Sequence, residues 1–295
     1  TLPLTIEGTS MPLAQKHYEK IGSAQVKSAI LLAGLNTPGI TQVKARRSRD
    51  HTENLLNIIK ADLKVKKEKK DQLILLRGQK NLFGFNLSIS GDPSSAAPFI
   101  ILTLLATNSK LFIKNINCNP TRLGFINILK KMNADIKIKN LKKKSGEYVG
   151  NIFVKSGSLK PINCPKELVS SAIDEFPLLF IIASVIKGVC KFSGIAELRH
   201  KESDRIKSIE IGLNQIGIKT KSTIDSLKIF GNPNIKIEKT LQVYPQNDHR
   251  IAISYVILGL LLEGRIKIHN CETINTSFPG FLKLIRKVGG KFDVK

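Results

Sequence analysis

The sequence predicts an α/β protein made of a repeated β-α-β-α-β-β pattern, with its most apolar helices inside and its sheets outside. Each repeat is marked by a small residue that separates a helix-like stretch from a short alternating strand. This small residue occurs at Ala61, Ala134, Gly217 and Gly290, which lie 73, 83 and 73 positions apart. About four such repeats fill the 295 residues.

The two helices of each repeat differ in kind, and the difference predicts which of them is buried. The first is apolar nearly all round, as in 97–106 and 176–186, and a helix without a polar face must be buried on every side. The second is amphipathic, with Ile206, Ile209 and Leu213 at helical spacing. The strands alternate polar and apolar residues, so one face of each sheet meets water. Helices inside and sheets outside are the inverse of the usual α/β barrel.

Composition excludes several classes of protein. Hydrophobic residues make up 42% and charged residues 24% of the chain, as in ordinary globular domains. The longest apolar runs, 176–186 and 251–262, are shorter than the roughly 18 residues that span a bilayer, so we expect no membrane association. The four cysteines form no CxxC pair and the histidines no HExxH motif, so we expect no metal or other cofactor. Scattered cysteines fit a reducing, cytoplasmic location.

The formal charge of +24 has two interpretations. It either reflects lysines spread over solvated faces or indicates an anionic partner such as nucleic acid or a phosphorylated metabolite. Aromatic residues make up 6% of the chain and none is Trp, so stacking surfaces for single-stranded nucleic acid are scarce. We therefore expect no nucleic-acid partner, although a basic RNA-binding module stays open as an alternative.

Polar residues collect where the expected helices begin. The expected N-caps of the four buried helices are Ser23, Ser94 or Ser95, Asp174, and Asn247 or Asp248. One further start carries more polar groups than capping requires, because Lys201, Glu202 and Arg205 lie within five residues. At the start with Asn247 and Asp248, His249 is followed by Arg250. Free N–H groups at helix N-termini attract anions, so these starts indicate an anion-binding site.

Seven segments, taken in their order along the chain, resemble the 5-enolpyruvylshikimate-3-phosphate synthase family. The Ser-Ala-Gln and Ser-Arg-Asp-His sequences among them are more similar to the family's second class than to its first. The seven segments are Ser23–Gln25, Ser48–Glu53, Gly91–Ala96, Asp174, His200–Arg205, Asn247–Arg250 and Ser277–Pro279. The resemblance runs from residue 1 to residue 295. It implies an inside-out, enolpyruvyl transferase-like α/β barrel, with about four of six repeats present here. It also implies transfer of the enolpyruvyl group of phosphoenolpyruvate to the 5-hydroxyl of shikimate 3-phosphate, with release of phosphate in the shikimate pathway of aromatic amino acid biosynthesis.

The resemblance also implies a domain division. Residues 1–88 correspond to a remnant of the domain that holds shikimate 3-phosphate, and residues 89–295 to the C-terminal enolpyruvyl transferase domain. The family's N-terminal Lys-Ser, its first Arg, its Gly-Asn-Ala-Gly-Thr loop and the Arg that follows have no counterpart in this sequence. We therefore expect a chain that lacks about the first third of a protein which, when intact, is a monomer.

Roles for individual residues also follow from the resemblance. Five positions correspond to residues that hold shikimate 3-phosphate: Ser23, Ala24, Gln25, Ser48 and Arg49. Six more correspond to catalytic or substrate-binding residues: Asp174, Lys201, Glu202, Arg205, His249 and Arg250.

Among these six, Asp174 is the candidate general base near the 5-hydroxyl, Lys201 contacts both substrates, and Glu202 is the candidate acid. Arg205 and Arg250 clamp phosphoenolpyruvate through bidentate pairing. Thr276 is a departure, because many first-class members carry Lys at this position. The related UDP-N-acetylglucosamine enolpyruvyl transferases are a second alternative, which the Ser23–Gln25 and His200–Arg205 forms disfavour.

We expect the 295-residue chain alone to be catalytically inert. Stabilisation of the transition state requires charges that converge from both halves of the site, and the unmatched motifs supply one half. A phosphate-release assay with both substrates tests this expectation. Turnover near that of an intact relative would contradict it.

Overall fold

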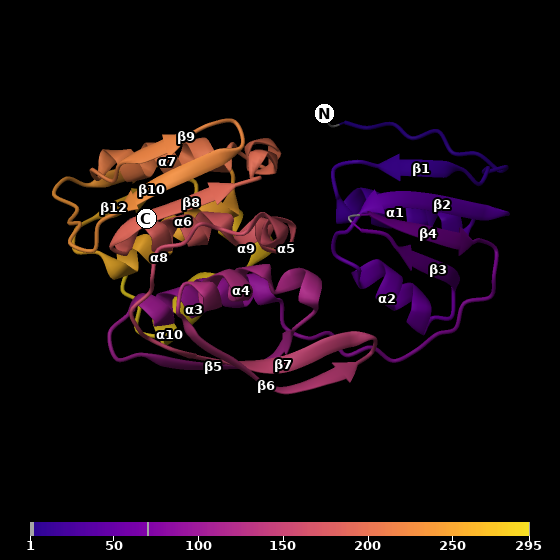
Figure 1. Ribbon diagram of the computed structural model, residues 1–295, viewed down its shortest axis with the longest axis horizontal. Coiled ribbons are helices and arrows are strands. Elements are labelled where there is room, and N and C mark those ends of the chain that lie inside the picture. The colour runs from indigo at the N-terminus through magenta and orange to yellow at the C-terminus, as the bar shows by residue number, and fades with distance from the viewer. Residues whose placement is uncertain (1–2, 70, 295) are drawn as a thin grey trace. The chain divides into compact units, whose positions relative to one another are not determined.

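The computed structural model describes residues 3–69 and 71–294, and these divide into two compact units (Figure 1). The first holds the described residues up to Ile89 together with Lys143–Tyr148, and the second holds 90–142 and 149–294. The functional roles that the resemblance gives to residues 1–88 and 89–295 stay predictions.

The first unit contains one complete β-α-β-α-β-β repeat. Its elements are β1 (Lys16–Glu19), α1 (Ala24–Leu35), β2 (Ile40–Arg46), α2 (His51–Ile58), β3 (Asp62–Lys67) and β4 (Asp71–Arg77). The strands form one sheet in the order β1-β2-β4-β3, with β1 parallel to β2 and the other pairs antiparallel. A small core includes Leu31 of α1, Leu56 of α2 and Ile74 of β4.

The second unit contains the remaining elements in two blocks of sequence, except for the end of β6 and the start of β7 within 143–148, which belong to the first unit. The first block has α3 (Pro93–Leu105), β5 (Lys110–Asn117), α4 (Gly124–Lys131), β6 (Asp135–Lys144) and β7 (Glu147–Lys155). The second block has α5 (Val169–Ala172), α6 (Phe176–Val185), β8 (Gly188–Ser193), α7 (Arg205–Gln215), β9 (Thr220–Ser222), β10 (Ser226–Gly231), β11 (Leu241–Val243), α8 (His249–Leu261), β12 (Ile266–Ile268), α9 (Thr273–Ser277) and α10 (Phe281–Lys287). The sheets are β5-β7-β6, β8-β10-β9 and the pair β11-β12.

The apolar helices lie inside the second unit, as the sequence predicts. Helices α3, α6 and α8 contact one another, and most of their side chains are buried while none is exposed. Figure 1 shows these helices between the β8-β10-β9 sheet and the β5-β7-β6 sheet. The outer face of β6 is lined by exposed lysines. The α/β class with inner helices and outer sheets is confirmed, and the described strands form separate sheets without closing into a barrel.

The repeats in the second unit are less complete than predicted. The first strand of two repeats is reduced to single parallel bridges, Gly91 to Ile116 and Asn163 to Lys191. The last predicted strand, after Gly290, does not form in the described part of the chain, 291–294. A strand exists only as part of a hydrogen-bonded ladder, and no described strand pairs with this segment.

The helix starts show which of the predicted N-caps hold. Ser23 accepts a hydrogen bond from the Val26 amide, and Asp248 accepts one from the Arg250 amide, so the caps of α1 and α8 are confirmed. The prediction for α3 is wrong by two or three positions. Asp92 caps this helix, because its carboxylate accepts from the backbone N–H groups of both Ser94 and Ser95.

Asp174 does not cap α6 as predicted. It lies in a 3-10 turn, Ile173–Glu175, that runs directly into the helix. Together with the short helices before it, the stretch Lys166–Val185 is long and apolar enough to cross a membrane by length and composition alone. Within this structure 72% of its most apolar window is buried, as in the core helix of a folded domain.

A buried carboxyl group links the starts of α3 and α6. Glu175 is 2% exposed, and its Oε1 accepts a hydrogen bond of 2.5 Å from the Ser94 hydroxyl. Burial raises the pKa of this carboxyl above its ordinary value, while the nearby Arg250 guanidinium opposes the rise and the charge of Asp174 adds to it. The folded protein therefore holds the proton of this carboxyl more tightly than the unfolded chain does.

We expect Glu175→Gln to change how stability depends on pH. A raised pKa in the folded state gives stability that is complete below the ordinary value of 4.5 and is lost as pH rises through the folded value. The melting temperature of the wild type should therefore fall relative to the variant, by a few degrees, as pH rises from about 4.5 to 8. Thermal unfolding across this range measures the effect, with Glu263→Gln at an exposed carboxylate as the control. A difference that stays constant with pH would show that Glu175 is ionised in the folded state.

Candidate functional site

The five predicted phosphate-site residues of the first unit lie on two segments. Ser23, Ala24 and Gln25 form the cap and first positions of α1, where the Ser23 hydroxyl also lies 3.5 Å from the Gln25 side-chain oxygen. Ser48 and Arg49 lie in the loop between β2 and α2. The free N–H groups of α1, two hydroxyls and one guanidinium are groups that bind a phosphate ester.

One hydrogen bond brings these two segments together. The side chain of Lys27, in α1, donates from Nζ to the backbone carbonyl of Arg49 at 2.7 Å. The hydroxyl of Ser48 is buried and has no hydrogen-bond partner among the described residues. A buried donor without a partner costs free energy, and the oxygen of a bound anion would satisfy it.

In the second unit, Arg205 is the centre of a buried cluster of charges. Its side chain is 2% exposed, with Nε 2.8 Å from Asp248 and Nη2 2.5 Å from Glu202. Nη1 lies 3.6 Å from Asp174 and, among the described residues, has no hydrogen-bond partner. The first residue of α7 is thus tied to the cap of α8 and to the turn before α6.

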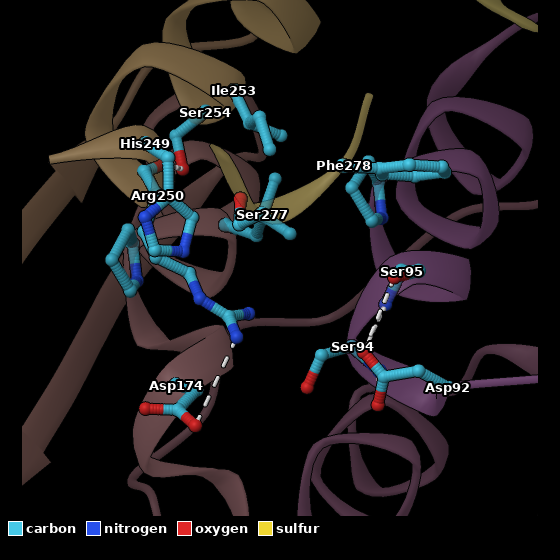
Figure 2. A pocket seen from close by; sticks show the side chains of 13 residues that line it. Asp92, Ser94, Ser95, Asp174, His249, Arg250, Ile253, Ser254, Ser277 and Phe278 are labelled. Atoms are coloured by element: carbon cyan, nitrogen blue, oxygen red, sulfur yellow. Dashed lines mark hydrogen bonds and ion pairs between the residues drawn. The ribbon is translucent and has the colours of Figure 1, made fainter. Parts of the chain in front are cut away.

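Arg250 lies beside this cluster at the start of α8. Its Nη2 is 3.9 Å from Asp174 and its Nη1 is 3.5 Å from Glu175, and the side chain is 19% exposed. Asp174 therefore lies between the two guanidinium groups of Arg205 and Arg250. Figure 2 shows the Arg250 side chain extending towards Asp174, with Ser94 on the opposite wall.

A pocket opens where α3, α6 and α8 begin. Its walls are Asp92, Ser94, Ser95, Pro98, Asp174, Pro177, Leu178, His249, Arg250, Ile253, Ser254, Ser277 and Phe278. The N-terminal N–H groups of α3 and α8 and the Arg250 side chain give this pocket positive groups, and Asp92 and Asp174 give it carboxylates (Figure 2). Such a pocket suits a small anionic ligand, and its carboxylates can exchange protons with that ligand.

The remaining predicted residues are placed differently. His249 lines the pocket, and burial together with the charge of Arg250 lowers the pKa of its imidazole, which favours the neutral ring at pH 7. Lys201 does not line the pocket, because its ammonium pairs with Glu197 one helical turn earlier. The structure therefore brings together Asp174, Glu202, Arg205, His249 and Arg250, with Lys201 nearby in sequence but paired elsewhere.

Several residues of the site were not predicted. Glu175, Arg122 and Asp92 extend the charge network, since Arg122 donates to Asp92 at 2.6 Å and to the Ser94 hydroxyl at 2.7 Å. The Gly91–Ala96 motif pointed to this region without giving its residues a role. Lys27 gave no signal in the sequence, because a lysine in a helix is rarely fully buried.

Metal ligands do not gather in the described part of the chain. No group of three or more His, Cys, Asp and Glu residues there could hold a metal ion. Burial, with the charge of Glu167 adding to it, raises the pKa of the Cys164 thiol to about 11, so this cysteine is a neutral packing residue at pH 7.

Known proteins resemble the chain over nearly its whole length. Residues 1–285 match the family described as EPSP synthase (3-phosphoshikimate 1-carboxyvinyltransferase). The 3-phosphoshikimate 1-carboxyvinyltransferase of Petrotoga mobilis is 44% identical over 97% of this chain and 65% of its own length. A solved EPSP synthase from Acinetobacter baumannii superposes with a TM-score of 0.85 at 38% identity, over 97% of this chain and 64% of that one.

A more distant structure shares the fold alone. The enolpyruvyl transferase NikO from Streptomyces tendae has a TM-score of 0.64 at 16% identity, over 88% of this chain and 58% of that one. The chain spans about 65% of the length of the curated relatives that it matches. Since both the sequence match and the superposition cover nearly all of its residues, the chain belongs to the EPSP synthase (3-phosphoshikimate 1-carboxyvinyltransferase) family.

Proposed function

We propose that the chain binds shikimate 3-phosphate and phosphoenolpyruvate and supplies part of the site that transfers the enolpyruvyl group to the 5-hydroxyl, with release of phosphate. The observation that carries the proposal is the cluster around Arg205. It gathers two guanidinium groups, three carboxylates and a neutral imidazole at adjacent helix starts. Anion binding and proton exchange need these groups together.

Phosphoenolpyruvate is the ligand that suits the pocket of the second unit. Its carboxylate and phosphate are both anionic, and Arg250 and Arg205 are the cations that face Asp174. The buried Nη1 of Arg205, which donates no hydrogen bond among the described residues, has capacity for one ligand oxygen. Burial raises the pKa of the Glu175 carboxyl, which lowers its tendency to carry a charge that would repel the ligand.

Shikimate 3-phosphate suits the segments of the first unit. Ser23, Ala24 and Gln25 offer a helix N-terminus and polar side chains, and Ser48 and Arg49 offer a hydroxyl and a guanidinium. The buried Ser48 hydroxyl without a partner supports a role for this loop in holding the phosphate. The family resemblance also implies that Gln25 lies near phosphoenolpyruvate.

The carboxylates divide the proton transfers between them. Asp174 takes the proton of the 5-hydroxyl as its oxygen bonds to C2 of phosphoenolpyruvate, and Glu202, 2.5 Å from Arg205, in its protonated form gives a proton to the methylene carbon. Glu202 takes a proton back from the resulting methyl group as the C2–O bond to phosphate breaks, which restores the enolpyruvyl double bond. Arg250 and Arg205 stabilise the charge that develops on the phosphate as it leaves. Lys201 contacts both substrates after its ammonium leaves Glu197, and His249 accepts a hydrogen bond as a neutral ring.

The first test is binding of phosphoenolpyruvate to the chain. Each charge-assisted hydrogen bond contributes about 1.5–3 kcal/mol, so Arg250→Gln should weaken the affinity by about tenfold to a hundredfold. Calorimetric titration measures it, with Arg265→Gln as the control because it removes the same charge at an exposed position. Equal affinities in all three proteins, or no binding by the wild type, would remove the second unit from the proposal.

The second test separates chemistry from binding. In an active protein that contains these residues, Glu202→Gln should lower kcat by about 10²- to 10⁴-fold with little change in KM, because a general acid acts in the transition state. Steady-state phosphate release gives both constants. A variant that changes KM alone would assign Glu202 to substrate binding.

We further propose that the protein works in the cytoplasm as a monomer and without a nucleic-acid partner. Free buried thiols such as Cys118 and Cys190 support a reducing compartment. The chemistry of the pocket accounts for an anionic partner without invoking RNA.

A further inference from the structure

The first unit contains a buried ion pair that the proposed chemistry does not use. Lys27 is 0% exposed and Glu53 is 3% exposed, and Nζ lies 2.6 Å from Oε1. Removing both charges from water costs free energy that their attraction offsets only when their other hydrogen bonds are also made. Because the pair is costly to bury, its position in the unit points to a role for it.

The pair and its other hydrogen bonds join four segments of the unit. Lys27 projects from α1 and Glu53 from α2, and the Lys27 ammonium also donates to the carbonyl of Arg49 at 2.7 Å. Glu53 Oε1 also accepts a hydrogen bond, at 3.1 Å, from the side chain of Gln72 on β4, and the buried Oε2 has no hydrogen-bond partner among the described residues. The pair thus connects both helices, the loop before α2 and the sheet.

Two of these segments carry the predicted phosphate site. The Lys27 amide donates to the Ser23 carbonyl at 3.2 Å, so Lys27 lies one helical turn after the cap of α1. Arg49, whose carbonyl accepts the hydrogen bond from the Lys27 ammonium, also supplies the guanidinium of the predicted site. One ammonium group therefore fixes the distance between the helix start and the loop.

Packing alone already holds the two helices together. Leu31 and Leu56 are fully buried in the core beneath α1 and α2. A second polar link also joins them, since the Ser28 and Thr52 hydroxyls are 2.6 Å apart. The Lys27 hydrogen bond differs from both of these contacts, because it ends on the Arg49 backbone of the loop.

We propose that Lys27, held by Glu53, is a positioning residue for the shikimate 3-phosphate site. It holds the loop that carries Ser48 and Arg49 against the start of α1 and does not itself touch the ligand. This inference rests on the proposed function for the identity of the ligand. The position of the loop is a property of the protein alone.

The test compares two double variants of the full chain. Lys27→Met with Glu53→Leu removes both charges and keeps apolar volume, an exchange that buried ion pairs tolerate. Ser28→Ala with Thr52→Val removes the neighbouring link and leaves the Lys27 contact in place. Hydrogen–deuterium exchange of the 47–50 amides, the melting temperature and the calorimetric affinity for shikimate 3-phosphate are measured for each.

We expect the Lys27/Glu53 variant to melt within a few degrees of the wild type. Its 47–50 amides should exchange at least tenfold faster, and its affinity should fall at least tenfold. The Ser28/Thr52 variant should match the wild type in both. Unchanged exchange and affinity in the Lys27/Glu53 variant would overturn the proposal.

Two further outcomes are decisive. If exchange accelerates as expected but the wild type does not bind shikimate 3-phosphate, the position of the loop depends on Lys27 and the proposed function is wrong. If the Lys27/Glu53 variant does not fold, Lys27→Gln with Glu53→Gln gives the same comparison. The neutral amides can pair with each other, and the shorter glutamine does not reach the Arg49 carbonyl.

Discussion

The burial of three helices without a polar face is the constraint on which the second unit depends. Helices α3, α6 and α8 bury most of their side chains, so charged groups collect at their ends. The first N–H groups of a helix have no partner within it, and Asp92 and Asp248 supply acceptors at two of these ends. The pocket is thus a consequence of how the core is packed.

The charges in the cluster at these helix starts partly balance one another. A fully buried guanidinium needs carboxylates around it, and Asp174, Glu202 and Asp248 surround Arg205. Three carboxylates around one cation leave an excess of negative charge, which Arg250 and the helix N-termini reduce. The balance leaves the pocket able to accept an anion while it keeps groups that exchange protons.

Much of the fold could be predicted from the sequence, as could several of the residues that lie together at the candidate site. The spacing of small residues gave the repeat, apolar patterning gave the inner helices, and Ser23 and Asp248 were recognisable as caps. The cap of α3 was missed because Pro93 at the first helical position moves the start two residues earlier. The last strand was predicted from its alternation, but pairing depends on a neighbour that local pattern does not contain. Partners distant in sequence, such as Glu175 and Ser94, leave no local pattern at all.

The two units use buried cations with different chemistry for a similar purpose. Lys27 joins a helix start to a loop through one carboxylate and one backbone carbonyl, a task that suits a compact ammonium with several donors. Arg205 joins three helix starts through three carboxylates, which requires the wide, planar guanidinium. Arg205→Lys would leave too few donors for the three carboxylates, and Lys27→Arg would place too large a side chain between α1, α2 and the loop. In both units, a cation in the interior therefore determines where the polar groups of the site are held.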